Sequence, residues 1–133
     1  MYLVTKRIDF CYGHRLLGHD GICRHPHGHN AVVEVDVGAV ALDDRAMVAD
    51  FADVKHVVKG WIDRELDHKM ILRHDDPLVA PLEALGEPVF KTDHDPTVEH
   101  LAKLIFDASR DSGLDVLAVR VWETPSSRAE YRD

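Results

Sequence analysis

His27-Gly28-His29-Asn30-Ala31-Val32-Val33-Glu34-Val35-Asp36-Val37 is the stretch that decides the fold. Successive side chains of a strand point to opposite faces. Here one face carries Ala31, Val33, Val35 and Val37, and the other carries Glu34 and Asp36. The alternation predicts a strand over residues 27–37 with one buried face. Residues 2–12 alternate less regularly and predict a second strand, with Tyr2, Val4, Ile8, Phe10 and Tyr12 on one face.

Two later segments change to the helical period. From Asp50, a plausible N-cap, apolar residues recur at helical spacing at Phe51, Val54, Val58, Trp61, Ile62 and Leu66. A second helix is expected from residues 95–97, where Pro96 suits the first turn and either Asp95 or Thr97 is a candidate cap. Its apolar stripe is Val98, Leu101, Leu104, Ile105 and Ala108, and Gly113 is a suitable stop.

The remaining segments complete the predicted fold. Residues 117–121 alternate as a third strand, and residues 129–131 predict a short fourth one. Residues 70–95 are rich in Pro, Asp and Gly and predict a loop, with a short extended piece at 89–91. The order ββααββ predicts one α+β domain over residues 1–133, with two helices on one face of a four-stranded antiparallel sheet.

Bulk properties exclude several classes of function. The net charge of −8 argues against a nucleic-acid binder, whose affinity comes mostly from Lys and Arg. No apolar stretch approaches the roughly 20 residues that span a bilayer, and the first residues lack the pattern of a signal peptide, so a cytoplasmic protein is expected. The two cysteines, Cys11 and Cys23, are then expected to be free thiols.

Histidines are concentrated in one part of the chain, where five of the ten lie between residues 14 and 29. His27 and His29 share a strand face, and His14 continues the buried parity of Phe10 and Tyr12. If the two strands pair, the three imidazoles converge at one end of the sheet. Three neutral imidazoles suit zinc and leave a fourth position open, as in catalytic sites. The alternative is that each is a satisfied core histidine.

Three further features suggest chemistry, each with a structural alternative. Cys23 precedes His27 by four residues and is expected to act as a base or nucleophile near a cation, unless it is a buried apolar side chain or a fourth zinc ligand. Glu123 should face inward, where it suits a ligand edge with two adjacent N–H donors, unless the strand has ended and it is solvated. Asp67 next to His68 can fix the tautomer of the His68 ring. The alternative is that the pair only ends the helix, since His is favourable near a helix C-terminus.

Five blocks of sequence resemble the 6-pyruvoyl-tetrahydropterin synthase and 6-carboxytetrahydropterin synthase superfamily. They are FCYGHRL at 10–16, CRHPHGHN at 23–30, DFADVK at 50–55 with LDH at 66–68, PTVE at 96–99 and WETPSS at 122–127. The blocks come in family order and cover nearly the whole chain. Ala31 stands where an aromatic residue is common, and Cys11 where Ser, Asp or Ala is usual.

The resemblance implies the tunnelling fold, in which subunits associate into an oligomeric barrel, commonly a hexamer of two stacked trimers. In this family the site lies at a subunit interface, so Asp67 and His68 need only reach the thiol of a neighbouring subunit. The site residues that it implies are His14, His27 and His29 as zinc ligands, Cys23, Asp67 and His68 as catalytic groups, and Glu123 as the anchor of a pterin ring.

The spacing of three residues between Cys23 and His27 is similar to that of the 6-carboxytetrahydropterin synthases of queuosine and 7-deazaguanine biosynthesis. The resemblance therefore implies conversion of 7,8-dihydroneopterin triphosphate to 6-carboxy-5,6,7,8-tetrahydropterin, with release of acetaldehyde and triphosphate. Two alternatives stay open: 6-pyruvoyl-tetrahydropterin synthase activity on the same substrate, and a non-catalytic zinc-binding assembly protein.

Overall fold

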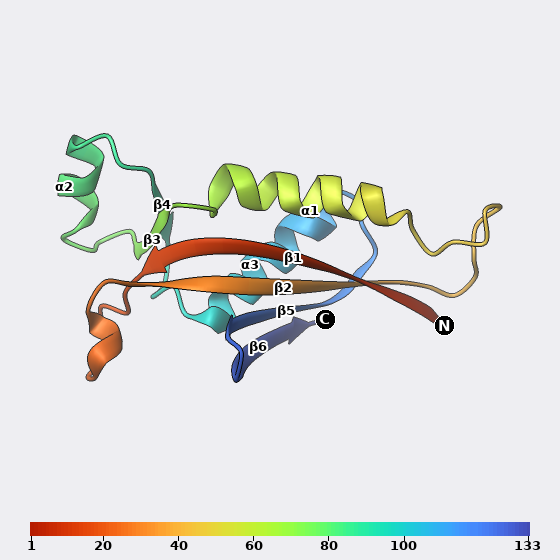
Figure 1. Ribbon diagram of the computed structural model, residues 1–133, viewed down its shortest axis with the longest axis horizontal. Coiled ribbons are helices and arrows are strands. Elements are labelled where there is room, and N and C mark those ends of the chain that lie inside the picture. Colours follow the sequence, from red (N-terminus) through yellow and green to blue (C-terminus); the bar gives the residue numbers. More distant parts are fainter.

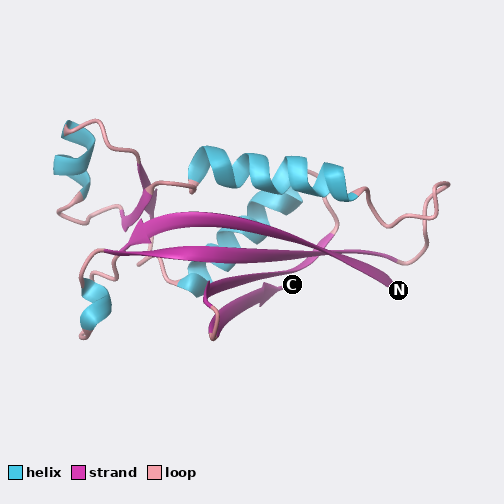
Figure 2. Cartoon of the chain, in the orientation of Figure 1, coloured by secondary structure: helices cyan, strands magenta, loops and turns pink.

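The computed structural model describes residues 1–133 and has the α+β architecture that the sequence predicts. Six strands form one curled sheet in the order β4-β3-β1-β2-β5-β6, and two long helices pack on it (Figures 1 and 2). The strands are β1 Tyr2–His14, β2 His27–Ala39, β3 Met70–Arg73, β4 Val89–Thr92, β5 Val116–Thr124 and β6 Ser127–Arg132. The helices are α1 Phe51–Glu65, α2 Val79–Ala84 and α3 Val98–Asp111, with a 3₁₀ turn at Ile22–Arg24.

The long antiparallel pair of β1 and β2 forms the centre of the sheet. Its register places Phe10 opposite Ala31, Tyr12 opposite His29, and His14 opposite His27. Residues directly opposite one another in such a pair lie on the same face. The face predicted to be buried is the core face, and it includes Ile8, Phe10, Tyr12, Ala31, Val33, Val35 and Val37.

Both long helices begin where capping residues were expected. The Asp50 side chain accepts a hydrogen bond from the Ala52 N–H, and that of Thr97 accepts one from the His100 N–H. Thr97, and not Asp95, is therefore the cap of α3. The side chains that the helices bury against the sheet are Val54, Val58 and Ile62 of α1 and Leu101, Ala102, Ile105 and Phe106 of α3. Each fully buried aliphatic side chain contributes about 1.5–3 kcal/mol.

The prediction of four strands was wrong, because the segment 70–95 holds β3, α2 and β4. The extended piece expected at 89–91 is part of β4. Both strands are four residues long and pair in parallel, β3 with β1 and β4 with β3. The pairing with β1 joins Met70 to Gly13, and a Cβ at Gly13 would overlap the Met70 sulfur. Glycine at position 13 thus lets the Met70 side chain lie against β1 where the added strand approaches it.

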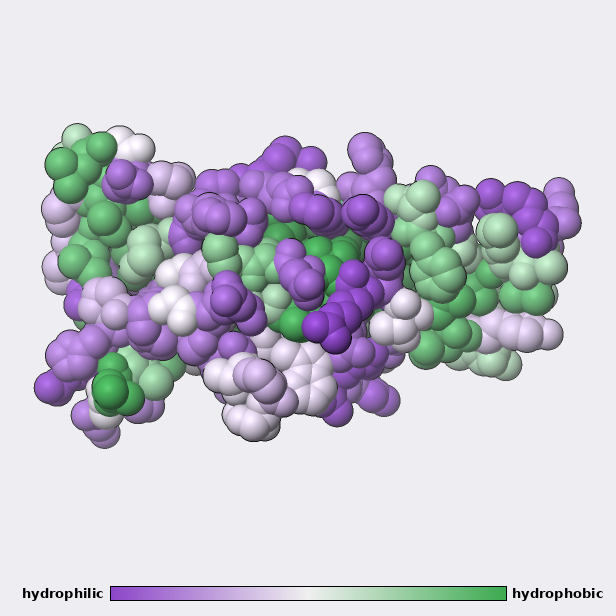
Figure 3. All heavy atoms as spheres, in the orientation of Figure 1, coloured by the Kyte–Doolittle hydropathy of each residue, from purple (hydrophilic) through white to green (hydrophobic).

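Polar side chains surround a smaller apolar area in the middle of the face shown in Figure 3, and further apolar side chains gather toward its two ends. One of these ends holds the start of β1 and the loop before α1, where Tyr2, Leu3, Met47 and Phe51 are exposed. None of the helices has the length and apolar character needed to cross a membrane.

Candidate metal centre and catalytic groups

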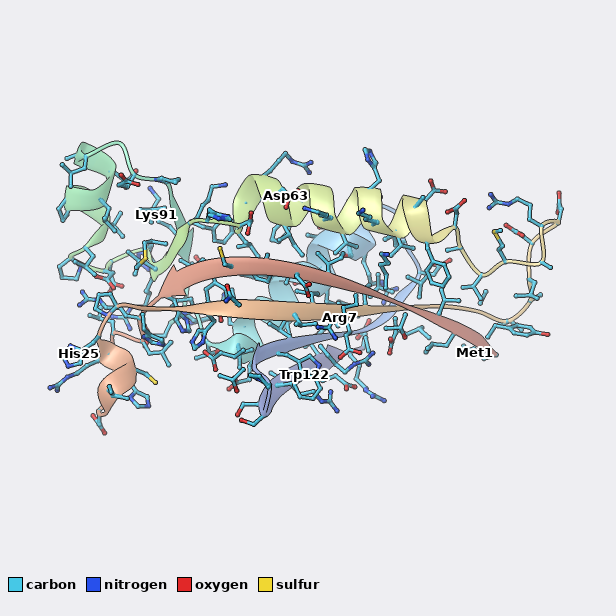
Figure 4. All side chains as sticks on the ribbon, viewed as in Figure 1. Met1, Arg7, His25, Asp63, Lys91 and Trp122 are labelled. Atoms are coloured by element: carbon cyan, nitrogen blue, oxygen red, sulfur yellow. The ribbon has the colours of Figure 1, made fainter.

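The ends of β1 and β2 bring His14, His27 and His29 together on the core face of the sheet. The ring centroid of His14 lies 4.5 Å from that of His27 and 5.1 Å from that of His29. The centroids of His27 and His29 are 5.0 Å apart. The convergence follows from the strand register. His14 and His27 form one cross-strand pair, and His29 belongs to the next pair on the same face, opposite Tyr12. Figure 4, which draws the side chains as sticks, labels His25 at this same end of the sheet.

Backbone carbonyls determine which nitrogen of two of these rings carries the proton. Nδ1 of His14 lies 2.8 Å from the Pro96 carbonyl, and Nδ1 of His27 lies 2.7 Å from the His25 carbonyl. Because a carbonyl oxygen only accepts, each Nδ1 donates, and in a neutral ring Nε2 then carries a lone pair. The two Nε2 atoms are 3.0 Å apart. Such a pair is unfavourable unless a cation lies between the lone pairs or one ring is protonated.

Burial disfavours the protonated rings. Loss of solvent lowers the pKa of His14 below its ordinary 6.5, against the opposing effect of the Pro96 carbonyl. Burial also lowers the pKa of His29, although the nearby Glu123 carboxylate works in the other direction. Burial therefore favours the neutral form of His14 and His29, which is the form that ligates metals.

Glu123 supplies a carboxylate to the same cluster. Its Oε1 lies 2.9 Å from Nε2 of His29 and 3.3 Å from Nε2 of His14. The contact with His29 is short, yet Nε2 of His29 is buried and has no hydrogen-bond partner. Three imidazole nitrogens and one carboxylate oxygen lie within 4.8 Å of one another. An unpartnered nitrogen in such a donor set fits a divalent metal ion, and nitrogen-rich sets suit zinc.

Tyr12 is a neighbour of this cluster that sequence reasoning assigned only to the core. Its ring lies 5.0 Å from that of His14 and 5.7 Å from that of His29, centroid to centroid. Its buried hydroxyl has no hydrogen-bond partner, and burial together with Glu123 raises its pKa well above the ordinary value. Tyr12 thus stays protonated and offers a donor beside the histidines. Its place opposite His29 in the strand register is the signal that could have revealed it.

Cys23 lies in the 3₁₀ turn of the loop that joins β1 to β2. Its carbonyl accepts a hydrogen bond from the Leu16 N–H at 2.9 Å, and the residue is half-buried. The sulfur is not among the donor atoms that gather around the three histidines. The loop therefore connects Cys23 to both histidine-bearing strands without making it part of the cluster.

Asp67 and His68, which follow α1, meet a different thiol in this chain. Nδ1 of His68 donates to Asp67 Oδ2 at 2.8 Å, and Nε2 of His68 lies 3.5 Å from the sulfur of Cys11. Cys11 is adjacent to Tyr12 in β1, so it faces away from the histidine cluster. Burial opposes ionisation of Asp67, but hydrogen bonds from the Cys11 N–H and from His68 outweigh it and lower the Asp67 pKa. The structure thus separates the Asp67–His68 pair from Cys23 within one chain.

The profile of the 6-pyruvoyl tetrahydropterin synthase family matches residues 3–133. The chain belongs to this family. Among its curated relatives, the 6-carboxy-5,6,7,8-tetrahydropterin synthase of Rickettsia bellii is 35% identical over 98% of this chain and 99% of the relative. The synthase of the same name from Haemophilus influenzae is 32% identical over the full length of both chains. The predicted resemblance is confirmed, and the chain is an enzyme, a lyase, of this 6-pyruvoyl tetrahydropterin synthase family.

Solved structures share the architecture of this chain. An uncharacterised protein from Wolinella succinogenes superposes with a TM-score of 0.79 at 29% identity, over 99% of this chain and 98% of that one. The 6-pyruvoyl tetrahydropterin synthase of Caenorhabditis elegans gives 0.72 at 24% identity, over 100% and 97%. The second likeness concerns the fold alone. Together they confirm the tunnelling fold, with six strands in place of the four expected.

Proposed function

We propose that the chain is a zinc-dependent 6-carboxy-5,6,7,8-tetrahydropterin synthase of queuosine or 7-deazaguanine biosynthesis. The reaction would convert 7,8-dihydroneopterin triphosphate and one water molecule to 6-carboxytetrahydropterin, acetaldehyde and triphosphate. The observation that carries this proposal is a cluster of three histidines in a chain that matches synthases of this name from end to end.

His14, His27 and His29 would hold the zinc ion through Nε2. The carbonyls of Pro96 and His25 support this role, because they orient two of the rings and keep their Nε2 lone pairs free. When bound, the zinc ion would act as a Lewis acid toward the oxygens of the substrate side chain.

Cys23 and His68 are the proposed proton carriers. Cys23, as thiolate, would take a proton from the substrate at its sulfur, and its position on the loop beside both histidine-bearing strands supports this role. His68 has its Nδ1 proton committed to Asp67, so its Nε2 is the atom that would gain or lose a proton. The pair sits away from its own chain's histidine cluster. We therefore propose that it acts on the site of a neighbouring subunit in an oligomer, such as a hexamer of two trimers.

Glu123 is the proposed anchor of the pterin ring. Its carboxylate lies on the face of the histidine cluster, and a quarter of its side chain is exposed, at 24%. A carboxylate can accept two parallel N–H bonds from the 2-amino group and the adjacent ring nitrogen of a pterin. Binding in this way would direct the substrate side chain toward the histidines and Cys23.

Product analysis tests the proposal. The purified protein, loaded with zinc, is incubated with 7,8-dihydroneopterin triphosphate, and the products are identified by mass spectrometry. We expect 6-carboxytetrahydropterin and acetaldehyde in equal amounts. Formation of 6-pyruvoyl-tetrahydropterin without acetaldehyde would contradict the proposed reaction and indicate 6-pyruvoyl-tetrahydropterin synthase activity instead.

A further inference from the structure

A second array of reactive side chains lies on the face of the sheet opposite the histidine cluster. The sulfur of Cys11 is 3.5 Å from Nε2 of His68, and Nδ1 of His68 is 2.8 Å from Oδ2 of Asp67. Because a carboxylate only accepts, the ring proton is on Nδ1, and Nε2 is free to accept the thiol proton. A nucleophile that faces a base, itself oriented by a third group, is the arrangement of an activated thiol.

The backbone holds this array in place. The His68 N–H donates to the Cys11 carbonyl at 2.8 Å, and the Cys11 N–H donates to Asp67 Oδ1 at 3.0 Å. His68 has a φ of 58°, in the left-handed region that residues other than glycine seldom adopt. Backbone strain of this kind persists where the surroundings over-determine the conformation, and it concentrates at functional sites. A further hydrogen bond joins the same two segments, because the Gly13 N–H donates to the carbonyl of Lys69, the residue that follows His68.

The array opens to space that a small molecule can enter. Cys11 and His68 line two cavities, of about 540 and 510 Å³. Asn30, the residue directly opposite Cys11 in the β1–β2 pairing, lines both of them. Cys11 is half-buried, whereas the side chain of His68 is 79% exposed. A ligand can therefore reach the sulfur along the imidazole.

We propose that Cys11 is a covalent modification site for soft carbon electrophiles of the α,β-unsaturated carbonyl class. The thiol proton passes to Nε2 of His68. The sulfur then forms one bond to the β-carbon while the C=C π bond opens, and the resulting enolate takes the proton back from His68. The net step adds S–H across the double bond, with no leaving group and no oxidant or reductant.

The hydrogen bonds around the sulfur favour this addition over acyl transfer. Attack on an ester or thioester needs donors placed at the oxyanion that forms beside the nucleophile. The backbone donor of the nucleophile's own residue, the Cys11 N–H, is already bonded to Asp67. Conjugate addition instead moves charge to a carbonyl oxygen remote from the attacked carbon, and the Asn30 amide can donate to such an oxygen within the cavities that it lines.

An adduct on Cys11 would occupy the space in front of Nε2 of His68. Modification of this thiol is thereby coupled to any proton transfer that His68 performs. The contacts that carry the proposal all lie within one chain, so it stands independently of the proposed synthase reaction.

N-ethylmaleimide, an electrophile of this class, tests the proposal on the folded protein. In the variant Cys23→Ser, Cys11 is the only thiol, and its labelling is followed by intact mass against time. Adding His68→Gln should slow labelling roughly 10- to 100-fold, at or below the lower end of what a general base contributes. Adding His56→Gln, which removes an exposed imidazole of α1, should leave the rate unchanged. Circular dichroism verifies that each variant is folded.

Equal labelling rates in the His68→Gln and His56→Gln proteins would overturn the proposal, as would labelling that begins only after denaturant is added. Asp67→Asn in the same Cys23→Ser background provides a second comparison if His68→Gln does not fold. A rate equal to that of the His56→Gln control would again overturn it. No arm of the experiment reads synthase activity, so its failure is distinguishable from failure of the proposed function.

Discussion

Nε2 of His14 lies 3.0 Å from Nε2 of His27, and on each ring the other nitrogen faces a backbone carbonyl. Neither Nε2 can donate to the other while both rings are neutral. Burial of His14, which is 1% exposed, opposes the protonation that would relieve this contact. Strand register, carbonyl placement and burial thus act together to direct lone pairs at one point, and a bound cation satisfies them.

The metal-free protein should lose stability as the pH falls below about 6.5, the ordinary pKa of histidine. Burial lowers the pKa values of His14, His29 and His100 in the folded state. At a pH between the pKa of a histidine in the folded state and its pKa in the unfolded chain, the unfolded chain binds more protons. The free energy of unfolding therefore decreases as the pH falls, and it levels off below the pKa values of the folded state. The lowered carboxylate pKa values of Asp36 and Asp76 act only below their ordinary 3.8.

Urea unfolding of chelator-treated protein between pH 8 and pH 5 measures this dependence. His14→Gln should reduce the slope, because it removes one of the titrating groups. Zinc-loaded protein should show a steeper loss, since protons compete with the metal for the same nitrogens. A midpoint that stays constant or rises as the pH falls would show that the buried rings are not held neutral.

Cys23→Ala should keep zinc but lose turnover by roughly 10²–10⁴-fold, as expected when a general acid–base group is removed. The sulfur is outside the histidine cluster, so the metal content should not change. Ile22→Ala is the matched control, because Ile22 is the neighbour in the same turn and is 83% exposed. Turnover of dihydroneopterin triphosphate at the wild-type rate in Cys23→Ala would make Cys23 structural and remove the basis of the proposed mechanism.

Glu123→Gln should act mainly on substrate binding. A hydrogen bond to a charged group contributes about 1.5–3 kcal/mol, so KM should rise by roughly 10- to 100-fold. Steady-state kinetics and metal analysis are measured together, with the exposed Glu83→Gln as control. Loss of zinc with KM unchanged would identify Glu123 as a metal ligand instead, since its carboxylate already contacts His29 and His14.

A site shared between subunits predicts complementation. Light scattering should give a mass several times 15.0 kDa. Cys23→Ala and His68→Ala chains, each inactive alone, should regain part of the activity when refolded together, because mixed oligomers contain sites with one intact thiol and one intact imidazole. A fully active monomer, or mixtures that never exceed the separate chains, would refute the shared site.

The central hairpin and its histidines could be predicted because both depend on local rules. The period of two places His27 and His29 on one face. The two strands follow each other in the sequence, so antiparallel pairing is the simplest arrangement, and it brings in His14. The helix starts at Asp50 and Thr97 are equally local, since a cap needs only the residues of its own first turn.

The added strands and the Cys11 contact could not be predicted in this way. The four residues of β3 show no alternation, and their parallel partner in β1 lies far away in the sequence. The contact between Cys11 and His68 depends on that same long-range pairing and on the left-handed backbone of His68, which no sequence period encodes. For Glu123 the parity predicted an inward carboxylate, but not that it would contact the histidines.

X-ray absorption at the zinc edge tests most directly whether three imidazoles form the metal centre. We expect about one zinc per chain, surrounded by three nitrogen ligands and a light exchangeable ligand, with no sulfur. His27→Ala should lose the metal, whereas His25→Ala should keep it, because only the backbone carbonyl of His25 supports the His27 ring. A sulfur ligand in the resting protein, or full zinc content in His27→Ala, would contradict the assignment of His14, His27 and His29 as an open, catalytic zinc site.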